Sequence, residues 1–189
     1  MRLVGVSGSL RAGSYNSALL RAAQGLTPDG VDLIEGSIRD IPLYDGDVER
    51  DQGLPEAVVA LKDLIVDSDG LLLFTPEYNN GMPGVFKNAI DWLSRPASDI
   101  ERVFGGRPVA VLGASPGPFG TVMSQAAWLP VLRTLGTAPW FGGRMMVPHA
   151  GSAFDADGQL TDEDARRRLA RFVHGFAEHC RVVRAGRQT

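Results

Sequence analysis

Short apolar runs alternate with longer amphipathic stretches along the whole chain. A short apolar run predicts a buried strand, whereas apolar residues spaced three and four positions apart predict a helix. We therefore expect strands at residues 3–6, 31–34, 70–75, 108–114 and 140–147. By the same reasoning, we expect helices at residues 14–24, 55–66, 83–94, 120–135 and 161–180.

Strands that alternate with helices favour an α/β fold, in which helices cover both faces of a parallel sheet. The 189 residues suffice for one domain, which we place at residues 1–183, followed by a flexible tail at residues 184–189. Ligands of such sheets bind beyond the carboxyl ends of the strands. The loops after the first, third and fourth strands are therefore the candidate binding regions.

The composition excludes several classes of function. Hydrophobic residues make up 44 % of the chain, and its net charge of −3 gives no electrostatic argument for nucleic acid or an anionic membrane. The single cysteine, Cys180, cannot form an intrachain disulfide and is too few for a zinc site, so we expect no metal. No apolar run is long enough to span a bilayer, and residues 1–6 are too short for a signal peptide. We expect a cytoplasmic protein.

The first candidate loop, residues 7–17, is rich in serine and glycine. A helix N-terminus presents free N–H groups and partial positive charge, which suit a phosphate, and Arg11 adds a full charge. Gly13 is followed by Ser14 where a P-loop has lysine, and no G-x-G-x-x-G pattern is present. The loop thus favours a terminal monophosphate. The alternative is a polar turn in which Ser14 or Asn16 caps the helix.

The second candidate loop, residues 75–84, follows the most apolar strand. It combines the soft or flat side chains of tyrosine and methionine with two asparagine amides. Such a loop can frame a planar heterocycle, whose edge is read by backbone N–H and C=O groups. The alternative is a rigid, proline-bounded turn that exposes its tyrosine.

The third candidate loop, residues 113–120, begins with the G-x-S-x-G pattern of α/β-hydrolases, in which Ser115 would be the nucleophile. Pro116 argues against that chemistry, because the residue after the nucleophile must donate its backbone N–H to the oxyanion and proline has none. The available histidines, His174 and His179, lie inside the predicted terminal helix. We therefore expect this loop to donate hydrogen bonds to a ring carbonyl.

Taken together, the loops resemble those of a known family. Residues 8–16 are similar to the G-S-x-R-x-x-S-x-N phosphate loop of the NADPH-dependent FMN reductase family, which includes quinone, azo-dye and chromate reductases. Residues 76–84 are similar to its P-E-Y-N-x-x-x-P-G loop. The chain departs from the family at Gly81, where many members have serine, and at Pro116 and Pro118, which stiffen the third loop. These departures affect the expected access of substrate rather than cofactor binding.

The resemblance implies a flavodoxin-like three-layer sandwich, with five parallel strands in the order 2-1-3-4-5. It also implies non-covalent FMN as the cofactor and NADPH or NADH as the co-substrate. The residues implied for the FMN phosphate are Ser9, Arg11, Ser14, Asn16 and Ser17. Those implied for the isoalloxazine ring are Pro76, Glu77, Tyr78 and Asn79. Those expected near its pyrimidine end are Ser115, Gly117 and Gly120.

The implied activity is that of an NAD(P)H oxidoreductase, which passes hydride through N5 of FMN to a small acceptor by a ping-pong mechanism. The acceptor could be a quinone, a flavin, an azo compound or a metal oxyanion. No protein side chain is expected to be catalytic, since the cofactor carries the chemistry. A homodimer or homotetramer, formed through helices that flank the flavin, is also implied. The alternatives are a flavodoxin-type electron carrier without pyridine-nucleotide turnover and, more remotely, an α/β-hydrolase that uses Ser115.

Overall fold

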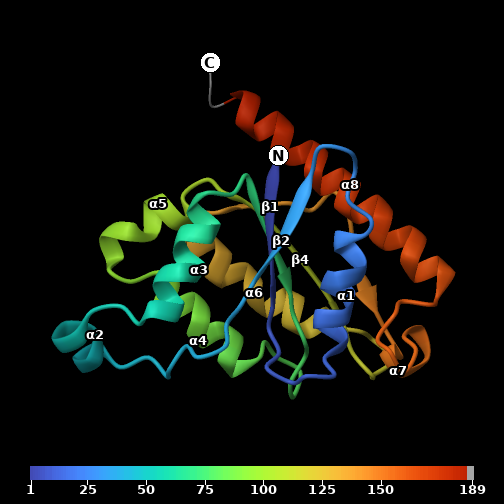
Figure 1. Ribbon diagram of the computed structural model, residues 1–189, viewed down its shortest axis with the longest axis horizontal. Coiled ribbons are helices and arrows are strands. Elements are labelled where there is room, and N and C mark those ends of the chain that lie inside the picture. Colours follow the sequence, from blue (N-terminus) through green and yellow to red (C-terminus); the bar gives the residue numbers. More distant parts are fainter. Residues whose placement is uncertain (187–189) are drawn as a thin grey trace.

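The computed structural model describes residues 1–186, which are built around a parallel sheet (Figure 1). Its strands are β1 (Arg2–Ser7), β2 (Asp32–Gly36), β3 (Gly70–Phe74), β4 (Pro108–Ala114), β5 (Ala138–Pro139) and β6 (Met146–Val147). Their order is β2-β1-β3-β4-β5, with β6 also paired to β4. Each pairing between these strands is parallel. The predicted flavodoxin-like strand order is confirmed.

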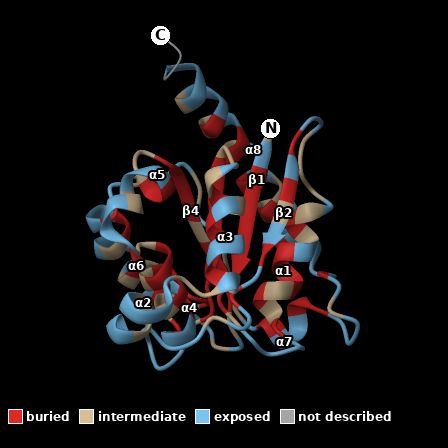
Figure 2. Cartoon of the chain, turned by 60° about the vertical axis from the view of Figure 1, so that its left-hand side comes forward, coloured by how far each residue is buried: buried red, intermediate tan, exposed pale blue. Residues whose placement is uncertain are grey.

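Helices flank the sheet on both faces. They are α1 (Tyr15–Gln24), α2 (Gly46–Gln52), α3 (Glu56–Val66), α4 (Gly84–Leu93), α5 (Ile100–Phe104), α6 (Val122–Thr134), α7 (Ala150–Ala153) and α8 (Glu163–Gly186), with a short 3₁₀ helix η1 (Ala97–Asp99). Alternate residues of a strand point to opposite faces, so Leu72 and Phe74 pack with α1 and α8, while Leu71 and Leu73 pack with α3, α4 and α6. The central strands β1, β3 and β4 are accordingly buried along most of their length, whereas β2 at the edge is only partly buried (Figure 2).

The first loop and its helix follow from local chemistry. Ser14 is the N-cap of α1, and its Oγ accepts the N–H groups of Asn16 and Ser17 at 3.2 Å each. Gly8 is required by packing, because a Cβ atom there would lie 2.2 Å from the ring of Phe86 in α4. The start of the loop is thereby pressed against α4.

The predicted strand at residues 140–147 is not continuous, so this prediction is wrong. After β5, the N–H of Trp140 donates to Val109 at 2.8 Å, and the chain then leaves the sheet until β6. The indole of Trp140 packs instead against Phe172 and Phe176 of α8, at ring-centroid distances of 5.1 and 5.8 Å. Packing of this indole against α8 thus takes the place of the strand pairing that we expected after residue 140.

The terminal helix is longer than predicted. α8 runs to Gly186, so the first residues of the expected tail at 184–189 are helical, and residues 187–189 lie outside the described part of the chain. Arg184 also donates to Asp69 at 3.1 Å. The short helices α2, α5 and α7 were not anticipated from the periodicity. No helix in residues 1–186 is long and apolar enough to cross a membrane.

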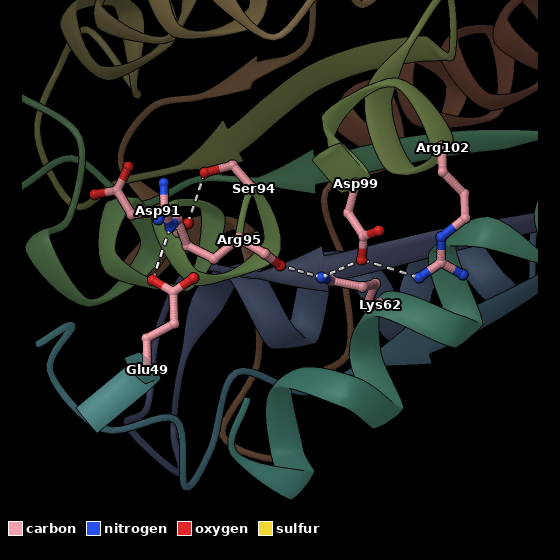
Figure 3. Close-up of polar contacts among 7 residues, drawn as sticks. All are labelled: Glu49, Lys62, Asp91, Ser94, Arg95, Asp99 and Arg102. Atoms are coloured by element: carbon pink, nitrogen blue, oxygen red, sulfur yellow. Dashed lines mark hydrogen bonds and ion pairs between the residues drawn. The ribbon is translucent and has the colours of Figure 1, made fainter. Parts of the chain in front are cut away.

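A buried lysine joins several of these elements (Figure 3). Lys62 of α3 is 2 % exposed, and its Nζ donates to the carbonyl of Arg95 and, at 2.9 Å, to Oδ2 of Asp99. The same Asp99 oxygen accepts from Arg102 at 3.2 Å, while Arg95 pairs with Glu49 of α2 at 2.8 Å. Hydrogen bonds from Lys62 and then Arg102 lower the pKa of Asp99.

We predict that Asp99→Asn lowers the free energy of unfolding by about 2 kcal/mol, because it leaves the ammonium of Lys62 charged and without its carboxylate in the interior. Urea unfolding at neutral pH measures the loss. Arg102→Ala is the matched control, since its exposed ion pair should contribute less than about 1 kcal/mol.

Asp99→Asn should also change how the free energy of unfolding depends on pH in the acid range. Because the pKa of Asp99 is below its ordinary 3.8 in the folded state, its contribution is complete above that pH and is lost as the pH falls through the folded value. The difference between wild type and Asp99→Asn should therefore shrink in acid. A difference that grows on acidification would contradict this account.

Candidate functional site

The three candidate loops meet around one cavity of about 280 Å³ at the carboxyl ends of β1, β3 and β4. Most of the predicted binding residues line it: Ser9, Arg11, Ser14, Asn16, Pro76, Glu77, Tyr78 and Ser115. Its further lining residues, each a chain neighbour of a predicted one, are Tyr15, Ala114 and Pro116. The predicted residues outside its lining are Ser17, Asn79, Gly117 and Gly120.

The first loop presents a row of free backbone donors. Within the described chain, Arg11 is the only one of residues 9–15 whose backbone N–H makes a hydrogen bond, to Oγ of Ser9 at 3.3 Å. These groups adjoin the N-terminus of α1, whose dipole adds partial positive charge. The guanidinium of Arg11 lies 5.9 Å from the ring centroid of Tyr15 and is exposed. Such a loop is suited to an anion with several oxygen atoms.

Asn16 has a structural role that its motif position did not reveal. Its side chain is buried, donates from Nδ2 to the carbonyl of Ala114 at 2.9 Å, and accepts the N–H of Ala114 at Oδ1 at 2.9 Å. The carboxamide is therefore committed to the end of β4 rather than pointing at a ligand. Ser17 is likewise turned away, since its Oγ donates to Ser7 at 2.9 Å.

The second loop is a tight hairpin turn. Tyr78 and Gly81 exchange two backbone hydrogen bonds of 3.0 Å, and Asn79 and Asn80 between them have φ angles of 50° and 61°. Asparagine tolerates this left-handed conformation, which explains the pair at the turn. Tyr78 is half exposed at the rim of the cavity, with its hydroxyl 3.5 Å from Ser9. A side chain at position 81 would make only ordinary contact, so Gly81 is not needed by the turn.

Glu77 joins the second loop to α6. Its Oε2 accepts the N–H groups of Met123 and Ser124 at 2.8 and 3.0 Å, and thereby caps a helix whose own N-cap residue provides no side-chain bond. Behind it, the buried hydroxyl of Thr75 lies 2.7 Å from Oγ of Ser124 and accepts from Trp128 at 3.0 Å. The sequence carries no signal for this contact, because the N-cap residue Thr121 is of a type that commonly caps a helix with its own side chain.

The third loop does not assemble a hydrolase. Oγ of Ser115 accepts the N–H of Gly117 at 3.2 Å, and no hydrogen bond in residues 1–186 joins Ser115 to a histidine or an acid. His174 and His179 lie on α8 and do not line the cavity. Gly113 is required by packing, since a Cβ there would lie 2.1 Å from the carbonyl of Thr75. The hydrolase alternative is therefore rejected.

We predict that Glu77→Ala lowers the free energy of unfolding by about 1–2 kcal/mol, because two N–H groups of α6 lose their cap. Glu77→Gln retains an acceptor oxygen and should lose less, mainly the favourable charge at the helix N-terminus. Urea unfolding followed by circular dichroism compares the two variants. Equal losses for Ala and Gln would exclude capping as the stabilising contact.

Comparison with known proteins shows the family. The sequence model of the NADPH-dependent FMN reductase family matches residues 1–152. The NAD(P)H-dependent FMN reductase PA1204 of Pseudomonas aeruginosa is 47 % identical over 166 residues, which cover 88 % of each chain. The 2-hydroxy-1,4-benzoquinone reductase of a Burkholderia species is 39 % identical over 177 residues, which cover 94 % of each chain.

Solved structures give the same result. The flavoenzyme FerB, an NAD(P)H:(acceptor) oxidoreductase from Paracoccus denitrificans, superposes with a TM-score of 0.84 at 36 % identity, over 95 % of this chain and 97 % of FerB. From the matched family model and these relatives, the chain belongs to the NADPH-dependent FMN reductase family and is an oxidoreductase of the class that uses FMN and NAD(P)H.

Proposed function

We propose that this protein uses non-covalently bound FMN to pass reducing equivalents from NADPH or NADH to a small acceptor, in ping-pong order. The acceptor class comprises quinones, free flavins, azo compounds and metal oxyanions. The observation that carries the proposal is the set of free backbone N–H groups on either side of Arg11 in the first loop, together with the guanidinium of Arg11. The names of the relatives, an FMN reductase and a benzoquinone reductase, support it.

The donors of the first loop fit the phosphate of FMN. A phosphate monoester has three terminal oxygens and close to two negative charges, and it needs several donors at short range. Ser9, Arg11 and Ser14 line the cavity and bring two hydroxyls and a guanidinium to it, and the loop that carries them adds free backbone N–H groups. In this proposal Asn16 and Ser17 do not contact the phosphate. They position the loop through their hydrogen bonds to Ala114 and Ser7.

The other two loops fit a planar ring. Pro76 and Tyr78, which follow β3, give the cavity an apolar surface. Ser115 and Pro116, which follow the neighbouring strand β4, line the same cavity. Because Oγ of Ser115 accepts from Gly117, its own O–H remains available to donate to a ring carbonyl. Gly117 and Gly120 would shape this loop, since Gly120 has a φ of 64° and a Cβ atom there would lie 2.9 Å from Cβ of Met146.

When bound, FMN supplies the redox chemistry at N5, and this fold has to supply only binding, orientation and a polar edge for the ring. No nucleophile or general base among the cavity residues is invoked. The chain's own part is to hold the phosphate at Arg11 and the ring near Pro76 and Ser115. The three loops surround one cavity, which supports use of a shared space by nucleotide and acceptor in turn.

We also propose that the protein forms a homodimer or homotetramer through helices beside the cavity. The outward side of α6 exposes Val122, Met123 and Leu129, at 40, 52 and 44 %. Phe119 and Phe141 on adjoining loops are more than two-thirds exposed. A cluster of this kind marks an association surface on soluble proteins.

Rapid mixing of the FMN-loaded protein with excess NADPH, without oxygen, tests the activity. We expect the flavin absorbance band to bleach within seconds and to recover when a benzoquinone is added. Persistence of the band for minutes, in protein that retains its flavin, would instead identify a flavodoxin-type electron carrier and defeat the reductase proposal.

For the phosphate site, we predict that Arg11→Ala weakens FMN binding about tenfold or more, because a charge-assisted phosphate contact is lost. Riboflavin is the matched ligand, since it has the same ring without the phosphate and should bind both proteins alike. Fluorescence titration of the flavin measures both affinities. A loss that is the same for riboflavin would assign Arg11 to the ring or to folding.

A further inference from the structure

A second cavity arises where the edge of the sheet is interrupted. The register pairs Val109 with Pro139 and Gly113 with Met146, so the outer chain has more residues than β4 for the same length. Six outer residues, 140–145, thus face three residues of β4, and between the sheet hydrogen bonds of Trp140 and Met145 this segment lies against α8 instead of the sheet. Between this segment and α8 is a cavity of about 370 Å³, which shares no lining residue with the flavin cavity.

Close packing fixes the shape of this second cavity. The indole of Trp140 meets the ring of Phe172 edge-on, at 72°. Cβ atoms at Gly142, Gly143 and Gly175 would lie 2.6, 2.9 and 3.0 Å from the same indole. Only glycine allows the segment and α8 to approach so closely, and the cavity therefore has a rigid, partly aromatic wall.

The charged lining of this cavity is entirely basic. It consists of Arg144 from the segment and Arg168 and Arg171 from α8, and no acidic residue lines it. Arg168 donates to the carbonyl of Met146 at 3.0 Å, which holds its guanidinium at the cavity. Within residues 1–186, neither the Arg144 nor the Arg171 side chain has an ion pair or a hydrogen bond.

Three arginines of α8 that do not line the cavity are paired, whereas Arg166, also outside the cavity, has no ion pair within the described residues. Arg167, Arg181 and Arg184 each pair with a carboxylate, at 3.5, 3.1 and 3.1 Å. Like charges one turn apart on a helix, as at positions 168 and 171, are unfavourable without a counter-charge. In a chain of net charge −3, a basic cavity without acids is a local reversal that would attract anions.

We propose that this cavity binds a phosphorylated small molecule with a planar body, of the size and chemistry of a nucleoside monophosphate. A guanidinium group can donate two parallel hydrogen bonds to the oxygens of a phosphate. Three positive charges suit a phosphate, with nearly two negative charges, better than a carboxylate with one. The partly exposed indole of Trp140, backed by the buried ring of Phe172, supplies an apolar surface for the planar part. The cavity volume lies within the range of small-molecule sites.

Calorimetric titration of the FMN-saturated protein with AMP tests this proposal. We expect one AMP per chain, weaker binding of inorganic phosphate and the weakest binding of adenosine, and affinity that falls as salt is raised. Arg144→Gln and Arg171→Gln should each weaken AMP binding about tenfold or more, because each removes a charge-assisted contact. Both side chains are exposed, so the variants are expected to fold.

Arg167→Gln is the matched control, since it removes an arginine of the same helix that pairs with Asp164 outside the cavity. It should leave AMP binding unchanged. The absence of AMP binding, or equal binding by Arg144→Gln, Arg171→Gln and wild type, would overturn the proposal.

Discussion

The geometry of the cavity at the carboxyl ends of β1, β3 and β4, where we propose that FMN binds, depends on the two hydrogen bonds between the carboxamide of Asn16 and the backbone of Ala114. They join the helix of the first loop to the end of β4, where the third loop begins. Glu77 and Thr75 perform the equivalent task for the second loop, which they fasten to α6. Buried polar groups are costly to leave unpaired, so these contacts hold all three walls together before any ligand binds.

Much of the fold could be predicted from the sequence, because it follows from local patterns. The central buried strands and the capped helix after Ser14 agree with the structure, as does the strand order that the family resemblance implied. The edge of the sheet could not be predicted, because the side chain of Trp140 packs on a helix more than thirty residues away and the chain beyond Trp140 leaves the sheet. Helix α8 continues beyond residue 183, and a contact distant in sequence again accompanies the difference, because Arg184 pairs with Asp69.

The candidate site was predictable as a place more than as a set of roles. Asn16 and Glu77 occur in motifs that resemble ligand-binding loops, yet their side chains bond to groups 98 and 46 residues away. No local pattern separates a polar side chain that contacts a ligand from one that braces the loop. The pattern at residues 113–117 also has a structural explanation without hydrolytic chemistry. Gly113 is required by the close carbonyl of Thr75, and Oγ of Ser115 accepts the N–H of Gly117.

The contact between Gly8 and Phe86 has an evolutionary consequence. The phosphate loop begins where the backbone lies against that aromatic ring, with no space for even one extra carbon. Drift at position 8 is therefore tied to the side chain at position 86, which lies on another helix and beyond the second loop. Among relatives, these two positions should change together or not at all, so that the loop is inherited with the helix beneath it.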